Sequence, residues 1–241
     1  MSARTNELGQ LVGLPVDGWT GAERPPRTPM IGRYCRLEPI DADRHGPELF
    51  EAYSADTDGR NWTYLPVGPF DRFETFDKWM RAFCLGDDFL FFTVIDGQSA
   101  KAVGIASYLR IDPANGSIEV GFISFSPALQ RTPASTEAMY LMMARVFDEL
   151  GYRRYEWKCD SLNAPSNAAA KRLGFLYEGL FRQATVYKAR NRDTTWYSII
   201  DTEWPAVKKG FEKWLAPENF DANGRQIARL STVIEAARGE S

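Results

Sequence analysis

The segment IEVGFISFSPALQRTPASTEA, residues 118–138, decides the fold, because it joins a buried strand to the start of a helix through a polar turn. Its first part, Ile118 to Phe125, is rich in β-branched and aromatic residues, which is typical of a strand. Gly121 lies in the middle of that strand and indicates a bulge or a close approach by another chain or a ligand.

A helix follows, with apolar residues at helical spacing from Ala134 to Leu150. Thr132 is the expected N-cap, Pro133 suits the first helical position, and Gly151 ends the helix. The first amides of a helix have no partner within it and carry partial positive charge, so this turn is a candidate site for a phosphate. An ordinary capped helix explains the same residues, since most strand-turn-helix units bind nothing.

Composition limits the class of protein. The chain has 241 residues, of which 44% are apolar and 25% charged, as in a globular protein with one main domain. A net charge of −3 without long basic runs argues against a nucleic-acid partner. No apolar stretch is long enough to span a membrane, and the polar N-terminus does not resemble a secretion signal.

Cysteine and histidine limit the chemistry further. Cys35, Cys84 and Cys159 are far apart and lack CxxC spacing, which argues against a metal site and a disulfide framework, and we expect a cytoplasmic protein. The one histidine, His45, falls in the first turn of an expected helix, where we expect a surface role. Without a GxSxG motif it does not indicate a Ser-His-Asp hydrolase.

The pattern along the chain predicts three regions: an extended arm over residues 1–29 too rich in Gly and Pro for regular elements, a domain over 30–203, and a helical extension over 204–241. Within the domain, the predicted order is strand 32–40, helices 41–54 and 71–85, strands 89–95, 102–111 and 118–125, helix 134–150, strand 154–160, a short helix after Asn163, and strands 176–188 and 194–200.

This order resembles the GNAT superfamily of acyl-CoA N-acetyltransferases, and the motifs resemble its RimJ/RimL branch. The specific parts are Gln130 to Ala138, and Asn163-Ala-Pro-Ser166 followed by Leu173-Gly174-Phe175 and Glu178-Gly179. The resemblance covers residues 32–201. It implies an α/β (α+β) GNAT fold: a mixed, mostly antiparallel, twisted sheet of about seven strands flanked by helices and splayed between the fourth and fifth strands.

The resemblance also implies a site for acetyl-CoA without a metal. The pyrophosphate would lie on Gln130, Arg131, Thr132, Ala134, Ser135 and Thr136, and the pantetheine arm on the backbone of Ile123 and Phe125 and on Asn163. The chain departs from the family pattern where Pro133 and Ser135 replace two glycines, which removes one amide donor and restricts the backbone.

Two residues are catalytic candidates. Glu119 lies at the spacing where some family members place a general base, although an outward-facing carboxylate in a salt bridge is the alternative. Ser166 matches the serine that RimL-like enzymes place near the coenzyme A sulfur, although capping of the short helix explains it equally well. The glutamate that RimL-like enzymes add on the next strand is Thr185 here.

The acceptor would enter beside the loop between the first two helices, where Trp62 and Tyr64 contact the substrate or anchor the loop. The chain is therefore expected to be an N-acetyltransferase acting on a primary amine of a small molecule, an aminoacyl or peptide-like compound or a protein N-terminus, by direct transfer in a ternary complex. The alternative is a non-catalytic acyl-CoA-binding or scaffold module with a degenerate pyrophosphate loop. A homodimer is compatible with the arm and the apolar C-terminal helix.

Overall fold

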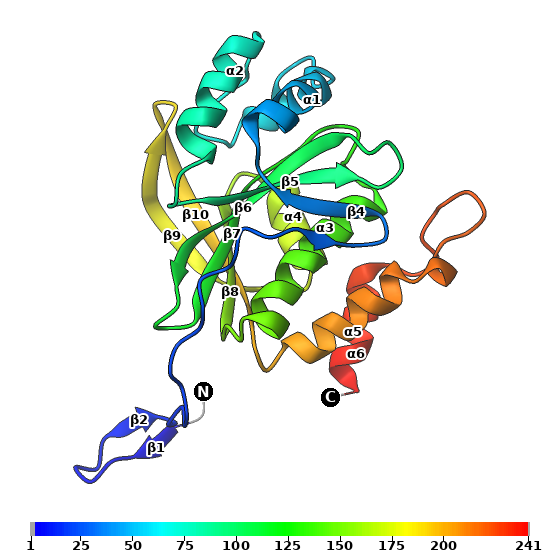
Figure 1. Ribbon diagram of the computed structural model, residues 1–241. Coiled ribbons are helices and arrows are strands. Elements are labelled where there is room, and N and C mark those ends of the chain that lie inside the picture. The colour runs from blue at the N-terminus through cyan, green and yellow to red at the C-terminus, as the bar shows by residue number, and fades with distance from the viewer. Residues whose placement is uncertain (1–2, 241) are drawn as a thin grey trace.

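The computed structural model describes residues 3–240 and has an eight-stranded sheet at its centre (Figure 1). The strand order is β3-β4-β5-β6-β7-β8-β10-β9, and β7 and β8 form the parallel pair in an otherwise antiparallel sheet. The predicted mixed, mostly antiparallel α/β sheet is confirmed. The strand beyond the predicted seven is β3, which has two residues.

The strands of this sheet are β3 (Met30–Ile31), β4 (Cys35–Pro39), β5 (Leu90–Asp96), β6 (Ala102–Asp112), β7 (Ser117–Phe125), β8 (Arg154–Asp160), β9 (Leu176–Tyr187) and β10 (Arg190–Ile200). The α-helices are α1 (Ala42–Ser54), α2 (Phe73–Trp79), α3 (Pro133–Ala144), α4 (Ala164–Arg172), α5 (Trp204–Leu215) and α6 (Leu230–Gly239). Short 3-10 or π turns are η1 (Arg60–Trp62), η2 (Met80–Cys84), η3 (Arg145–Glu149) and η4 (Pro217–Asn219). In the described range, no helix is long and apolar enough to cross a membrane.

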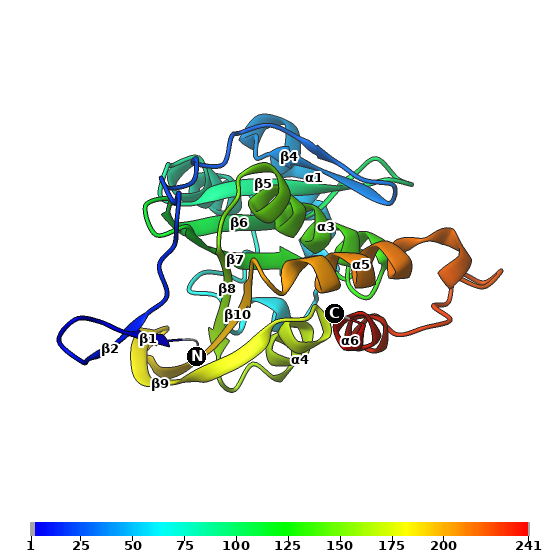
Figure 2. The ribbon, with the colours of Figure 1, turned by 90° about the horizontal axis from the view of Figure 1, so that it is seen from below.

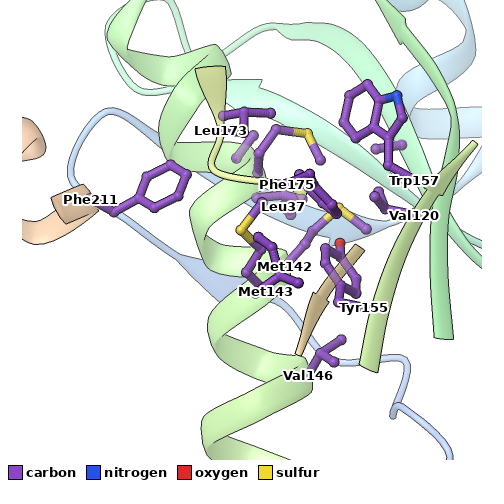
Figure 3. Packing of buried hydrophobic residues seen from close by; sticks show 14 of the residues in the cluster. Leu37, Val120, Met142, Met143, Val146, Tyr155, Trp157, Leu173, Phe175 and Phe211 are labelled. Carbon is purple, nitrogen blue, oxygen red and sulfur yellow. The ribbon is translucent and has the colours of Figure 1, made fainter. Parts of the chain in front are cut away.

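Helices cover both faces of the sheet (Figure 2). The buried hydrophobic residues form two clusters. Helices α3 to α6 pack on one face over the larger cluster, which Figure 3 shows from close by. Helices α1 and α2 pack on the other face, where the smaller cluster is mainly aromatic. Alternation along β8 shows the division: Tyr155 and Trp157 enter the larger cluster, whereas Glu156 and Lys158 point to the opposite face.

The N-terminal arm contains a regular element, contrary to the sequence expectation. β1 (Ala3–Thr5) and β2 (Leu11–Gly13) form a two-stranded hairpin that projects from the domain (Figure 1). Its turn is held by the Asn6 side chain, whose Oδ1 accepts from the amides of Leu8 and Gln10, so local side-chain bonds compensate for the high Gly and Pro content. Leu8 and Leu11 are exposed on this hairpin.

His45 has a structural place in the core rather than the expected surface role. It is 2% exposed, its Nδ1 accepts from the Asp41 amide at 3.1 Å, and its Nε2 lies 3.3 Å from Glu38 Oε2. Burial, and then the charge of Arg44, lower the pKa of His45, although Glu38 opposes the shift. Within the first turn of α1, Ala42 and His45 are buried, whereas Asp43 and Arg44 are exposed.

A buried carboxylate connects α3 to the start of the sheet. Glu137 is 5% exposed, and its oxygens accept from the backbone amides of Arg33, Tyr34 and Cys35 at 2.8, 2.6 and 2.8 Å. Gly32 makes this approach possible, because a Cβ there would lie 2.3 Å from Glu137 Oε2. The turn between β3 and β4 therefore fixes the position of α3, whose first turn borders the candidate site.

Replacing Glu137 by alanine leaves three backbone amides without their acceptor. We expect Glu137→Ala to lower the free energy of unfolding by about 3 kcal/mol, since each buried donor left unsatisfied costs roughly 1–3 kcal/mol before relaxation. Urea denaturation followed by circular dichroism measures this change. The control is Glu235→Ala, which truncates an exposed glutamate in α6 and should have little effect. Equal stability of the two variants would show that these amides find other acceptors.

Candidate functional site

The sheet opens between β7 and β8, as the resemblance implied. The two strands pair from Ser117 and Arg154 to Val120 and Trp157, and no further. Beyond this point β7 continues to Phe125 along β6, while β8 continues to Asp160 along β10. Each strand is thus held by its outer neighbour while the inner edges part.

A bulge in β7 accompanies the opening. The register with β6 shifts between Ile105 and Ser107, and Phe122 takes a left-handed conformation with φ 48°. Gly121 precedes it, and a Cβ at that position would lie 2.9 Å from Leu109 Cδ2 and 3.4 Å from Glu119 Oε1. The glycine therefore keeps space beside the opening, as its place in the sequence indicated.

Helix α3 begins at the edge of the opening. Thr132 is its N-cap, as predicted: Thr132 Oγ1 accepts from the Ser135 amide at 3.2 Å, and Ser135 Oγ donates to Thr132 O at 2.8 Å. Pro133 occupies the first helical position and has no amide to donate. Arg131 has φ 62°, so a non-glycine residue adopts the left-handed turn before the cap. The Ser135 amide is already bonded, which leaves fewer amides for a phosphate than in an uncapped helix.

Other predicted loop residues point in different directions. Gln130 Nε2 donates to Phe125 O at 2.8 Å and to Asn61 Oδ1 at 3.0 Å, so its side chain spans from β7 to the loop after α1. Ala134 and Thr136 are buried, and Thr136 Oγ1 accepts from Arg172 of α4 at 3.0 Å. Ile123 is partly buried against the larger cluster.

Glu119 pairs with Glu156, one residue before the last pair of β7 and β8, and is buried rather than outward-facing, with an exposed fraction of 3%. Its Oε2 lies 2.6 Å from Arg110 Nη1 and 3.0 Å from Lys158 Nζ, which confirms a salt bridge. Both contacts involve the same oxygen, and Oε1 faces the side of Gly121. The carboxylate is thus held in place while one oxygen stays available.

Lys158 extends this network across β8. Its Nζ lies 2.7 Å from Glu156 Oε2 and 3.6 Å from the centre of the Trp196 ring. Burial opposes ionisation of Glu156, but the bonds from Lys158 and Arg154 outweigh it and hold the pKa of Glu156 below its ordinary value. The face of the sheet that carries Glu119 therefore has many charged groups, and these form ion pairs with one another.

The start of α4 places the two polar residues of the Asn-x-x-Ser motif side by side. Asn163 is the N-cap, and its Oδ1 accepts from the Ser166 amide at 3.1 Å. The side chain of Ser166 is free from capping, since its Oγ accepts from Trp157 Nε1 at 3.1 Å. The hydroxyl proton of Ser166 remains available, because the bond with the indole uses an oxygen lone pair.

Trp62 lies in the core, which favours the anchoring role of the two roles that the sequence left open for it. Trp62 is 3% exposed, with Tyr53, Phe70 and Trp79 rings 5.2, 5.3 and 6.3 Å from its own. Such a side chain anchors the loop and has little surface for a substrate. Tyr64 is half-buried, and its hydroxyl donates to Leu162 O at 2.9 Å, which ties the loop to the segment before α4.

Sequence reasoning missed the tip of the β9–β10 hairpin. Lys188 Nζ donates to the carbonyls of Trp62 and Gly68, both at 2.8 Å, so the hairpin tip is fastened to the acceptor loop. Tyr187 OH donates to the buried Asp160 at 2.7 Å, and burial, then the Asp160 carboxylate, raise the pKa of Tyr187 to about 12. The signal for this region was the basic segment KARNR, residues 188–192, which forms the hairpin turn and the first residues of β10.

Across residues 3–240, no group of three or more His, Cys, Asp and Glu side chains is arranged to hold a metal ion.

Comparison with known proteins identifies the family. The family model of the acetyltransferase (GNAT) domain matches residues 35–176. A GCN5-related N-acetyltransferase from Brucella melitensis is similar in structure, with TM-score 0.90 and 48% identity over 91% of this chain and 100% of that one. A probable acetyltransferase of the GNAT family from Chromobacterium violaceum has TM-score 0.75 and 42% identity, covering 80% of this chain and 96% of that one.

Sequence similarity to curated proteins is lower. The ribosomal-protein-serine acetyltransferase of Escherichia coli (strain K12) is 29% identical over 104 residues, which is 43% of this chain and 58% of that protein. The chain thus spans less than two thirds of the length of this relative, and the same holds for two Bacillus relatives at 63% and 57%. Because the family model matches more than half of the chain, the chain belongs to the GNAT acetyltransferase family, and it resembles the RimJ/RimL-like members.

Proposed function

We propose that the protein is an N-acetyltransferase that transfers the acetyl group of acetyl-CoA directly to a primary amine. The observation that carries the proposal is the opening between β7 and β8 next to the start of α3. An opened strand edge binds a ligand with several amide groups, and a helix N-terminus favours a phosphate. Coenzyme A carries both kinds of group.

The contact of Gln130 with Phe125 supports the fit of this co-substrate. The Gln130 side chain is an amide, and it already donates to Phe125 O at 2.8 Å. An amide of the pantetheine arm would make the same bond after Gln130 moves away. The loop residues Arg131, Thr132 and Ser135, the last of which stands where the family has a glycine, would then contact the pyrophosphate beside the first turn of α3. Arg131 is exposed there and contributes a positive charge.

The transfer itself needs a base and an acid. The neutral amine attacks the thioester carbonyl carbon, a C–N bond forms and the C–S bond breaks, the amine loses one proton, and the departing thiolate gains one. We assign removal of the amine proton to Glu119, whose Oε2 is fixed by two cations and whose Oε1 is available. We assign protonation of the departing thiolate to Ser166, whose hydroxyl oxygen accepts from Trp157 and whose proton therefore stays free to donate.

The acceptor would approach beside the loop of residues 61–69, which bonds from the β9–β10 hairpin hold in place. Tyr64 remains the substrate-facing candidate of this loop, while Trp62 supports it from the core. Acceptors of the protein N-terminal, peptide-like and small-molecule kinds all present a primary amine. A homodimer stays a prediction, with the projecting hairpin and the exposed apolar residues of β9 as its candidate surfaces.

A second candidate is a non-catalytic acyl-CoA-binding module. The observations that favour it are the capped Ser135 amide and Pro133, which reduce the amides available to a pyrophosphate. An assay for free thiol with a panel of amines separates the two: release of thiol that depends on the amine supports the transferase, whereas binding of acetyl-CoA without turnover supports the module.

Acetyl-CoA should stabilise the fold, because it binds the native state and not the unfolded chain. Arg131→Glu reverses the charge beside the proposed pyrophosphate position, and we expect it to raise the dissociation constant of acetyl-CoA by about 10-fold or more. Calorimetry and thermal shift measure this. Arg225→Glu makes the same charge change at an exposed, remote position and should leave binding unchanged. No thermal shift of the native protein at millimolar acetyl-CoA would contradict the proposed co-substrate.

Glu119→Gln should lower turnover by about 100-fold, a typical effect of losing a general base, with little change in acetyl-CoA affinity. The deficit should shrink as the pH rises, because more of the amine is then neutral without help. The measurement is turnover against pH for both proteins, with melting temperatures recorded in parallel to detect any loss of the Arg110 and Lys158 contacts. Turnover equal to that of the native enzyme at every pH would remove Glu119 from this role.

A further inference from the structure

Arg192, near the tip of the β9–β10 hairpin, has a guanidinium group without an anionic partner. Its Nε is buried and makes no hydrogen bond, and its contact within residues 3–240 is with the Tyr187 ring, whose centre lies 5.9 Å from Arg192 Cζ. The Arg192 side chain is half-buried, and burial of an unpaired polar atom such as this Nε destabilises a protein. The Tyr187 ring compensates only in part, since a cation–π contact is weak where solvent reaches the cation.

The charged residues around Arg192 form hydrogen bonds with other groups. Asp160 accepts from the Tyr187 hydroxyl and from a backbone amide, and Asp193 accepts from the Gln183 amide and the Asn191 side chain. Lys188 donates to carbonyls of the acceptor loop, as does Arg190. The hairpin therefore brings several cations together and supplies Arg192 with no carboxylate.

The residue opposite Arg192 removes a further source of compensation. In the ladder between β9 and β10, Arg192 pairs with Thr185, and side chains at opposed positions of antiparallel strands interact directly. Thr185 is uncharged, so the position opposite Arg192 supplies no anion to its guanidinium group.

Arg192 is also close to the opened part of the sheet. Tyr187 contacts Arg192 through its ring and Asp160 through its hydroxyl. Asp160 lies at the end of β8, beyond Trp157, where β8 has lost its pairing with β7. The loop that Lys188 contacts also bonds to segments on both sides of this opening, through Asn61 to Gln130 and through Tyr64 to Leu162.

We propose that Arg192 binds an anionic group of the acceptor, so that the acceptor is a small amine that also carries a carboxylate or a phosphate. This inference rests on the proposed acetyl transfer and names its substrate class. A guanidinium suits both anions, because it can donate two parallel hydrogen bonds. A free α-amino acid has the charge beside its amine, whereas a protein N-terminus has an uncharged peptide bond at that position.

The test compares acidic amines with neutral partners of the same shape. The pairs are glycine and glycinamide, L-leucine and L-leucinamide, L-phenylalanine and L-phenylalaninamide for the carboxylate, and O-phosphoethanolamine and ethanolamine for the phosphate. Thiol release gives kcat/KM for the native enzyme, Arg192→Gln, Arg192→Lys and the remote control Arg225→Gln. Ratios are compared across variants, because the amide also changes the basicity of the amine.

We expect Arg192→Gln to lower kcat/KM for one set of acidic amines by about 10- to 100-fold, the usual effect of losing a hydrogen bond to a charged group. Neutral amines, acetyl-CoA affinity and the melting temperature should change little, Arg192→Lys should retain part of the activity, and Arg225→Gln should behave as the native enzyme. A loss for the carboxylate set alone or the phosphate set alone identifies the anion.

Equal losses for acidic and neutral amines would overturn the inference, as would an Arg192→Gln enzyme with native activity toward every acidic amine. Calorimetry with the acidic amines in the presence of coenzyme A distinguishes the failure of this inference from that of the proposed function. If the native protein binds them, Arg192→Gln does not, and no amine is acetylated, Arg192 is an anion site and the transferase proposal fails. Absence of both binding and turnover with every acidic amine overturns the anion site.

Discussion

The parallel pairing of β7 with β8 ends at Val120 and Trp157, and the candidate site depends on this interruption. Backbone groups that stop pairing inside a sheet need other partners, because unbonded buried amides and carbonyls are costly. β6 and β10 hold the two strands from outside, so the inner edges part without unfolding the sheet. In this structure the Gln130 side chain satisfies one of the exposed carbonyls, that of Phe125.

The two faces of the sheet differ in character next to the opening. On the face of α3, Val120, Tyr155 and Trp157 fill the larger core and bring the start of α4 close enough for Trp157 to contact Ser166. On the opposite face, Glu119 and Lys158 form a compensated network that stays close to the opening. Successive side chains of a strand point to opposite faces of the sheet, so apolar core residues and charged residues occur within four residues of each other.

The fold was predictable because its signals are local. Strand patterns, the Thr132 and Asn163 caps and the helix-ending glycines gave the element order, and the Asn-x-x-Ser and Leu-Gly-Phe motifs gave the family. The small strands were not predictable in this way. The hairpin of β1 and β2 depends on one asparagine side chain at its turn, and β3 depends on the contact of Glu137 with the next turn.

The candidate site was only partly predictable, because it depends on contacts between distant segments. The sequence gives no register for β9 and β10, so the opposition of Arg192 and Thr185 was invisible. It also could not show that Trp62 turns into an aromatic cluster while Tyr64 remains half-buried, since both are aromatic residues of one loop. Glu119 was found by its spacing, but its burial and its two cationic partners come from neighbouring strands.

The most direct test of the central claim is a crystal structure of the protein with coenzyme A. The account predicts that the pantetheine arm lies between β7 and β8, that one of its amides donates to Phe125 O, and that the Gln130 side chain has left this carbonyl. Coenzyme A bound elsewhere, with the bond between Gln130 and Phe125 intact and the opening unfilled, would contradict it.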